Sequence, residues 1–282
     1  MHQTTRRNFL RSTAAITAGA LAAPSLFAAD APPANKPKPQ IGVQLYSVRN
    51  ELKTDFDGTI EKLGKIGFAG VEFASLMERQ RKPKDLRKLL DDNGLKTCGT
   101  HTPLQTLTGD ALKVTIDLHK ELGNTFLIAP SLPAKTIEQW QEMAKRFADI
   151  AAKCKEQGMH TGYHAHAGDF KLKDDTGRTS WELFFDTTSP DVIHQIDTGN
   201  TLDGGGDPLA MIKKYPGRTK SSHVKEHGVK DAPVGEGKVD WKTYLDAYES
   251  VGGIEWYVVE YEQADPLAKL KASLENLKKM GR

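Results

Sequence analysis

Cysteine is scarce in this 282-residue sequence, which has only Cys98 and Cys154. Two cysteines are too few for the disulfide framework of a small secreted fold. The hydrophobic patterns place Cys98 on a strand and Cys154 on a helix two structural units later. We therefore expect two buried free thiols.

The sequence also lacks a long apolar run and a strong excess of charge of one sign. Its most apolar N-terminal stretch, residues 14–23, is too short and too rich in Ala and Thr for a transmembrane helix, which needs about 20 apolar residues. The formal net charge is only +2. This balance gives no electrostatic reason to expect nucleic acid or an anionic membrane as a partner.

The N-terminal segment has the order of features found in export signals. Paired Arg6 and Arg7 are followed by Phe9, then by the weakly apolar run and by small residues around Ala28. This order resembles a twin-arginine signal, which predicts export to the periplasm or beyond. We expect a signal peptide at 1–29, a Pro-rich linker at 30–39 and one domain at 40–282. The signal holds three arginines and no acid, so its removal changes the formal charge from +2 to −1. No stable membrane insertion is expected after cleavage.

From residue 40 onward, short apolar runs alternate with longer patterns of helical periodicity. The predicted strands cover 41–46, 70–73, 95–101, 125–129, 159–166, 192–197, 219–225 and 254–260. The predicted helices cover 56–66, 83–93, 110–122, 137–157, 180–187, 208–214, 241–250 and 266–280. Strand–helix units with short connections imply parallel strands and right-handed crossovers.

Eight such units in a domain of this length predict an α/β fold of the (β/α)₈ TIM barrel type, for which roughly 250 residues are typical. A doubly wound open sheet is the main alternative. That fold usually carries a Gly-rich phosphate-binding turn after its first strand. Here residues 46–50 read YSVRN and contain no glycine. The barrel is therefore the prediction.

Polar residues follow or end most of the predicted strands. In a TIM barrel the C-terminal ends of the strands form the active site, so these residues are the candidates for chemistry. They are Glu72, His101, His164 with His166, Asp197, His223 with Lys225, and Glu260 with Glu262. Any one of them alone is more typical of packing or of a salt bridge. Four consecutive strands, the fifth to the eighth, nevertheless each place a ligand-type residue at the same end.

A divalent cation would compensate the cost of burying so many ionisable groups together. Mixed oxygen and nitrogen ligands without a thiolate favour one Mn²⁺, Co²⁺, Zn²⁺ or Mg²⁺ ion. The sequence does not choose among these metals.

The motifs at these strand ends resemble the sugar phosphate isomerase/epimerase superfamily, the xylose isomerase-like TIM barrels. The resemblance covers essentially the whole predicted domain. It rests on 42–49 (GVQLYSVR), 70–73 (GVEF), 99–101 (GTH), 162–166 (GYHAH) with 169–170 (DF), 197–200 (DTGN), 222–225 (SHVK), 235–237 (GEG), 239–241 (VDW) and 256–260 (WYVVE). Each motif is weak alone, and together they are specific.

The resemblance implies one metal bound from strands five to eight, which corresponds to His164, Asp197, His223 and Glu260. The sequence departs from the best-known epimerases, which use a glutamate on strand five. Because 163–166 read YHAH, His166 competes with His164 for the strand-five ligand. The loss of one carboxylate also weakens the case for a ketose epimerase mechanism that uses two carboxylates.

The expected chemistry is proton abstraction next to the carbonyl of a small sugar or keto-sugar. We expect His101, His166 and Lys225 to transfer protons. Glu72, Asp169 and Glu262 are expected to contact substrate.

Reprotonation of the enolate would make the enzyme an isomerase or epimerase. Loss of a β-substituent would make it a lyase or dehydratase that frees the aglycone of a 3-keto-glycoside, the reaction of some exported relatives. The superfamily's endonuclease branch is disfavoured by the near-neutral charge. A non-catalytic sugar-binding barrel would use Trp181, Trp241 and Trp256 as stacking surfaces. The sequence is compatible with an oligomer but does not define one.

Overall fold

The computed structural model describes residues 37–282, so the predicted signal peptide and most of the predicted linker lie outside the described residues. Within this part of the chain, strands and helices alternate as the sequence predicts. The strands are β1 Gln40–Gln44, β2 Gly70–Phe73, β3 Lys96–His101, β4 Phe126–Ala129, β5 His160–His164, β6 Val192–Gln195, β7 Ser221–Val224 and β8 Trp256–Val259.

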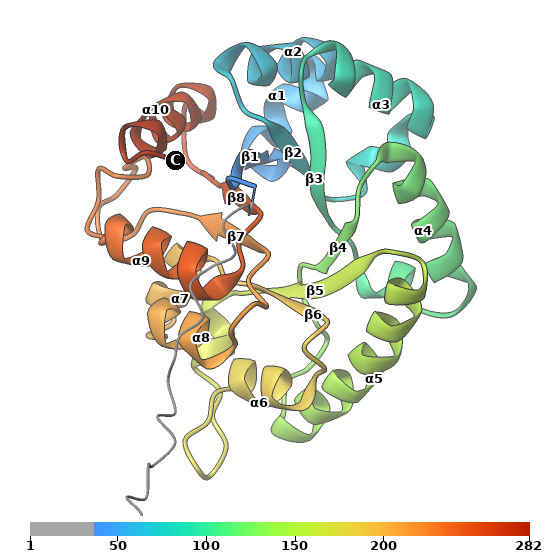
Figure 1. The fold of residues 1–282 in the computed structure, drawn as a ribbon, viewed down its shortest axis with the longest axis vertical. Helices are drawn as coiled ribbons and strands as arrows, with labels where there is room; N and C mark the ends of the chain where they lie inside the picture. Colours follow the sequence, from blue (N-terminus) through green and yellow to red (C-terminus); the bar gives the residue numbers. More distant parts are fainter. Residues whose placement is uncertain (1–36) are drawn as a thin grey trace, which may run out of the picture. The chain divides into compact units, whose positions relative to one another are not determined.

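These strands form one parallel sheet that curls into a barrel (Figure 1). The order is β6-β5-β4-β3-β2-β1-β8-β7, and every ladder is parallel. The remaining seam, between β6 and β7, is closed by shorter contacts. The backbone N–H of His223 donates to the carbonyl of Ile196 at 2.8 Å, and that of His194 donates to the carbonyl of Arg218 at 2.9 Å. The predicted (β/α)₈ barrel is confirmed.

The helices surround the strands (Figure 1). They are α1 Arg49–Thr54, α2 Phe56–Ile66, α3 Pro83–Asp92, α4 Gly109–Leu122, α5 Ile137–Glu156, α6 Ser180–Thr187, α7 Thr198–Asp203, α8 Pro208–Lys214, α9 Trp241–Ala247 and α10 Pro266–Lys279. Local sequence fixes several of their ends. Thr136 and Gln139 form a capping box that starts α5, and Gly67 ends α2 with a left-handed φ of 99°. No helix within residues 37–282 has the length and apolar character needed to cross a bilayer.

Three predicted strands, β1, β5 and β6, end two residues earlier than expected, and β1 stops at Gln44. β5 stops at His164, so His166 lies in the following turn. β6 stops at Gln195, and Asp197 instead caps the short helix α7, where its side chain accepts from the N–H of Asn200. Helices α1 and α7 were not predicted, because six residues are too few to show helical periodicity.

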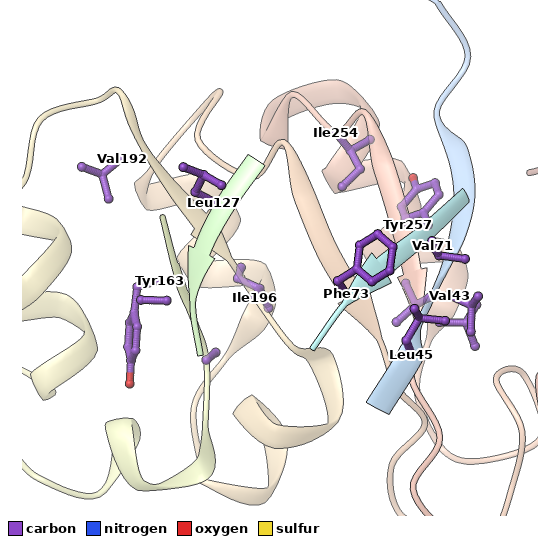
Figure 2. Packing of buried hydrophobic residues seen from close by; sticks show 14 of the residues in the cluster. Val43, Leu45, Val71, Phe73, Leu127, Tyr163, Val192, Ile196, Ile254 and Tyr257 are labelled. Carbon is purple, nitrogen blue, oxygen red and sulfur yellow. The ribbon is translucent and has the colours of Figure 1, made fainter. Parts of the chain in front are cut away.

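Apolar side chains form one layer between the strands and the helices, and polar side chains occupy one end of the barrel interior. Figure 2 shows part of the outer layer, with Val43 and Val71 on neighbouring strands. Inside the barrel, a separate small cluster contains Phe126, Ile128, Ile193 and Trp256. The two predicted free thiols, Cys98 and Cys154, are both buried and unpaired.

Glycine makes room for the inner cluster. A Cβ atom on Gly162 would lie 2.5 Å from the carbonyl oxygen of Ile193. One end of the barrel is therefore packed with apolar atoms, and the polar side chains gather at the other end, where the strands finish.

Candidate metal centre and its cavity

Five candidate residues lie at the C-terminal ends of the strands and are buried. His101 and His164 are the last residues of β3 and β5, and His223 lies within β7. Asp197 lies two residues after β6, and Glu260 follows β8 directly. The alternation of side chains along a strand turns them into the barrel mouth while their neighbours pack outward.

Four of these side chains meet at one point. His164, Asp197, His223 and Glu260 each offer one nitrogen or oxygen atom, and all four atoms lie within 4.8 Å of one another. Ligands on opposite sides of an ion at 2.0–2.2 Å are about 4.4 Å apart, so this spacing is close to that of a metal site. Oδ2 of Asp197 is buried and has no hydrogen-bond partner among the described residues. A cation at this point would satisfy that oxygen, so the residues fit a divalent ion.

Glu72 holds the far side of the His223 ring. Its Oε2 contacts Nε2 of His223 at 2.5 Å, while Nδ1 of His223 lies 3.3 Å from Oε2 of Glu260 and 3.9 Å from Oδ2 of Asp197. Nδ1 is therefore the nitrogen that faces the four-residue cluster. A carboxylate behind a metal-binding imidazole is a common means of fixing its orientation. Glu72 is fully buried below the cavity, a position that favours this role over contact with a sugar hydroxyl.

Gln195 links Glu72 to two more histidines. Its Nε2 donates to Oε1 of Glu72 at 2.8 Å and to the hydroxyl of Ser221 at 3.0 Å. Its Oε1 lies 3.1 Å from Nε2 of His101 and 3.1 Å from Nδ1 of His164. An amide oxygen only accepts, so each of these ring nitrogens carries the proton of its hydrogen bond. His164 then presents Nε2, its unprotonated nitrogen, to the cluster.

Burial and neighbouring charge move the histidine pKa values in opposite directions. Burial lowers the pKa of His101, and burial with three neighbouring imidazoles lowers that of His164 well below its usual value. Partial desolvation, together with the neighbouring His101, lowers the pKa of His166 to about 4. Burial also opposes the charge on His223, but Glu72 and Glu260 outweigh it and raise the pKa of His223 to about 10.

The carboxylates respond to the same neighbours. Burial favours the protonated form of Glu72, but His101 and His223 lower its pKa overall. His223 and Lys225 likewise overcome burial at Glu260 and keep its pKa well below the usual value. Burial raises the pKa of Asp197 to about 7, and Glu260 adds to the rise. Without a metal, His223 is therefore protonated at neutral pH and Asp197 is partly protonated.

A cavity of about 440 Å³ opens above the cluster. This volume lies within the roughly 300–1,000 Å³ of small-molecule sites. The cavity is lined by Tyr46, Ala74, Ser75, His101, Pro103, Pro130, His164, His166, Asn200, Lys225, Glu260 and Glu262. Nζ of Lys225 lies 3.5 Å from Glu260, 3.2 Å from Glu262 and 3.3 Å from the Asn200 amide oxygen. The negative charges of Asp197, Glu260 and Glu262 raise the pKa of Lys225 despite its burial.

The structure thus brings most of the predicted site residues to one cavity, with Glu72 just beneath it. Asp169 lies elsewhere: its carboxylate accepts from the Tyr163 hydroxyl at 3.0 Å and from the His166 N–H at 2.8 Å, and it does not line this cavity. Those bonds fix the turn that carries His166. Trp181 and Trp241 are buried in the core and Trp256 packs inside the barrel, so these tryptophans are not the exposed stacking surfaces of a sugar-binding site.

Sequence reasoning missed Gln195 and gave Gln44 and Asn200 no role. Gln44 donates to Glu72 at 2.8 Å, and Asn200 contacts Lys225. Gln195 could have been found from its spacing, because it lies two residues before Asp197 and on the same strand as the expected ligand. Tyr46, Pro103 and Pro130 carried no comparable signal, since Tyr46 lies in a short 3₁₀ helix after β1 and the two prolines lie in loops.

Parallel (β/α)₈ topology and a buried histidine–carboxylate cluster at the C-terminal ends of the strands define a TIM barrel with a candidate divalent-metal centre. A family model described as xylose isomerase-like TIM barrel matches residues 60–280. The chain belongs to this family, as the sequence motifs predicted.

Several known proteins share this fold and part of the sequence. Inosose dehydratase of Lacticaseibacillus casei is 26% identical over 257 residues, which cover 75% of this chain and 83% of the relative. Inosose dehydratase of Geobacillus thermodenitrificans (strain NG80-2) is 26% identical over 264 residues, with 76% and 84% covered. A crystal structure described as a sugar phosphate isomerase/epimerase from Parabacteroides distasonis ATCC 8503 has a TM-score of 0.75 and 23% identity, with 87% and 98% covered.

We expect the metal-free chain to bind one divalent ion and to release protons as it does so. The ion must displace the proton from His223, whose pKa of about 10 keeps the ring charged at neutral pH. Affinity for Mn²⁺ should therefore fall as the pH is lowered from 8 to 6. Calorimetry in buffers of different ionisation enthalpy measures both effects.

Asp197→Asn removes one charged ligand, and we expect it to weaken Mn²⁺ binding at least ~100-fold, since loss of an outer partner alone costs 10–100-fold. Asp203→Asn, an exposed carboxylate at the end of α7, is the matched control and should bind as the parent does. Equal binding by both variants would contradict the assignment.

A second prediction concerns the direction of the hydrogen bonds below the cluster, where Gln195 donates to Glu72 and accepts from His101 and His164. Gln195→Glu places a second carboxylate next to that of Glu72 and removes the hydrogen bond donated to Glu72. Mn²⁺ affinity should therefore fall about 10–100-fold. The double variant Glu72→Gln with Gln195→Glu restores one donor and one acceptor in reversed order but leaves His223 without its carboxylate partner, so it should recover part of the loss. ¹⁵N shifts of the histidine rings report the tautomers directly. A double variant as weak as both single losses combined would exclude this arrangement.

Proposed function

We propose that this chain is a divalent-metal-dependent enzyme that removes a proton next to the carbonyl of a keto-sugar or keto-cyclitol and expels a β-substituent. One observation carries the proposal: uncharged imidazoles and the Lys225 ammonium line one cavity around a cluster fit for a metal. The names of the sequence relatives, inosose dehydratases, support elimination as the second step.

His164, Asp197, His223 and Glu260 would hold the ion. When bound, it would draw electrons from a substrate carbonyl or hydroxyl oxygen and make the adjacent C–H more acidic. Glu72 and Gln195 keep the two ligand histidines in the tautomers that ligation requires. They act behind the ligands and have no contact with the cavity.

His166 is the best-placed base. Its pKa of about 4 keeps the ring unprotonated at neutral pH, and its ring lies at the cavity wall. The turn that carries it is fixed by the Asp169 carboxylate, which accepts from the His166 backbone N–H. His101 is a second uncharged imidazole in the same wall.

Lys225 supplies the acid for the second step. Removal of the α-proton leaves an electron pair that forms a new C=C bond as the β C–O bond breaks. The departing oxygen takes a proton from the Lys225 ammonium. The base later transfers the α-proton that it removed to Lys225, which restores the ammonium. Protons and electrons therefore balance without an oxidant or reductant. The raised pKa of Lys225 ensures that the proton is present at the start.

Epimerisation or isomerisation is the second candidate, and it begins with the same proton abstraction. His101 on β3 and His166 after β5 lie in one cavity, so a proton removed by one could be returned by the other on the opposite face. Under this alternative, the carbon skeleton and all substituents are retained.

The two candidates differ in what Lys225→Met should do. Under elimination, this variant keeps the base and loses the acid. We expect release of the leaving group to fall about 10²–10⁴-fold, the usual contribution of a general acid. Exchange of the α-proton with deuterium should continue. ¹H NMR of a 3-keto-glucoside in D₂O, with Mn²⁺ present, records both rates in one sample.

A p-nitrophenyl leaving group needs no protonation, and it should restore turnover by Lys225→Met. Lys220→Met is the matched control, because Lys220 immediately precedes β7 at the opposite end of the barrel and pairs with Glu255. Exchange with inversion and no release in the parent enzyme would select epimerisation. A parent that shows neither exchange nor release would refute both.

We also propose that the chain is exported by the twin-arginine pathway and cleaved near Ala28 to Ala31. The paired Arg6 and Arg7 and the apolar run after them support this proposal. Replacing both arginines with lysine should retain the uncleaved chain in the cytoplasm of a bacterial host. Fractionation and N-terminal sequencing test this, and an uncleaved cytoplasmic parent would refute it.

A further inference from the structure

We propose that a second cavity, next to the first, holds the leaving group of the substrate, and that this group is itself a hydroxylated ring. The inference rests on the proposed function. The second cavity has a volume of about 410 Å³. It shares Lys225, Glu260 and Glu262 with the first, so the two cavities meet at the residue assigned as the acid.

Three separate segments form the second cavity. Its walls come from the loop after β7, from the loop after β8 and from the end of α7. Nδ1 of His227 lies 2.8 Å from a carboxylate oxygen of Asp203, which joins the β7 loop to the end of α7. The cavity is therefore bounded on both sides.

The half-buried side chain of Glu226 holds the β7 loop in shape. The carboxylate of Glu226 accepts from the N–H of His227 at 3.0 Å, from that of Gly235 at 2.7 Å and from that of Val239 at 3.2 Å. It also accepts from the indole N–H of Trp241 at 2.7 Å. Four bonds to one side chain close the loop on itself. The wall it forms is thus preorganised, as a binding site requires.

A second anchor ties the same loop to α10. The N–H of Val234 donates to the Ser273 hydroxyl at 3.0 Å, and the amide of Asn276 donates to the Val234 carbonyl at 2.9 Å. The loop is therefore fixed at its base as well as around Glu226.

The chemistry of the lining favours a hydroxylated ring. His227, Lys230 and Asp231 offer donors and acceptors, and Tyr261 and Val229 offer apolar surface. Val229 is 46% exposed, one of few large apolar side chains so exposed among residues 37–282. A sugar ring presents hydroxyl groups at its edge and C–H groups on its face, and both can be matched here. A purely apolar aglycone would make no hydrogen bonds with His227, Lys230 or Asp231.

The arrangement of the two cavities matches a substrate of two rings. The keto ring would occupy the first cavity, above the metal-type cluster, and the second ring would occupy the other. The bond between them would cross Lys225. Elimination breaks the C–O bond of the keto ring, and the second ring leaves as a free alcohol that carries the proton.

Filling the second cavity tests this assignment. Val229→Trp should reduce kcat/KM for a 3-keto-glucoside whose leaving group is glucose by about tenfold, because the second ring loses its apolar and hydrogen-bonding contacts. For methyl 3-keto-glucoside, whose leaving group is small, kcat/KM should change less than about twofold. Val114→Trp is the matched control, because Val114 is an exposed valine on α4 that lines neither cavity. It should leave both substrates unaffected.

Direct binding separates this inference from the proposed function. Dissociation constants of the same two compounds, measured by calorimetry, need no turnover. If neither compound reacts but Val229→Trp weakens only the two-ring compound, the subsite stands and the proposed reaction fails. An equal loss for both compounds, or no loss for either, in binding and in turnover, would overturn the subsite.

Discussion

The contact between Glu72 and His223 is the interaction on which the rest of the site depends. Both side chains are fully buried, where an unpaired charge would cost several kcal/mol. Each therefore needs the other in its charged form, and the pKa of Glu72 falls while that of His223 rises. The pairing fixes which nitrogen of His223 faces the four-residue cluster. It also leaves the second oxygen of Glu72 free to accept from Gln195.

The charged Glu72 carboxylate can only accept hydrogen bonds, and this determines the direction of the neighbouring hydrogen bonds. Gln195 must turn its amide nitrogen toward the carboxylate, so its oxygen faces His101 and His164. The orientations and tautomers of the His101 and His164 rings are therefore fixed before a ligand binds. The apolar packing of Ile128 and Ile193 deeper in the barrel closes the cluster on the inner side. A metal ion or a substrate can therefore reach the cluster only through the mouth of the barrel, where Lys225 and His166 lie.

Much of the fold could be predicted from sequence because each barrel unit is short and local. Apolar runs marked the strands, and longer stretches of helical periodicity marked the helices. A metal site could be predicted because ligand-type residues end consecutive strands, and the family resemblance implied the four ligands, with His166 as a rival of His164. Gln195 and the role of Glu72 could not, because they depend on contacts across the barrel, between residues up to 151 positions apart. The second cavity could likewise not be predicted from the sequence, because Glu226 fixes its loop through hydrogen bonds that leave no local sequence pattern.

The central claim is that one divalent ion binds between His164, Asp197, His223 and Glu260. Anomalous diffraction from crystals grown with Mn²⁺ tests it most directly, because the signal locates the metal independently of any activity. We expect a single strong peak within coordination distance of ligand atoms of these four residues, with Nδ1 of His223 and Nε2 of His164 as the nitrogens. A peak ligated by His101, His164 and His223, a second group of possible ligands, or no peak in the barrel mouth, would contradict it.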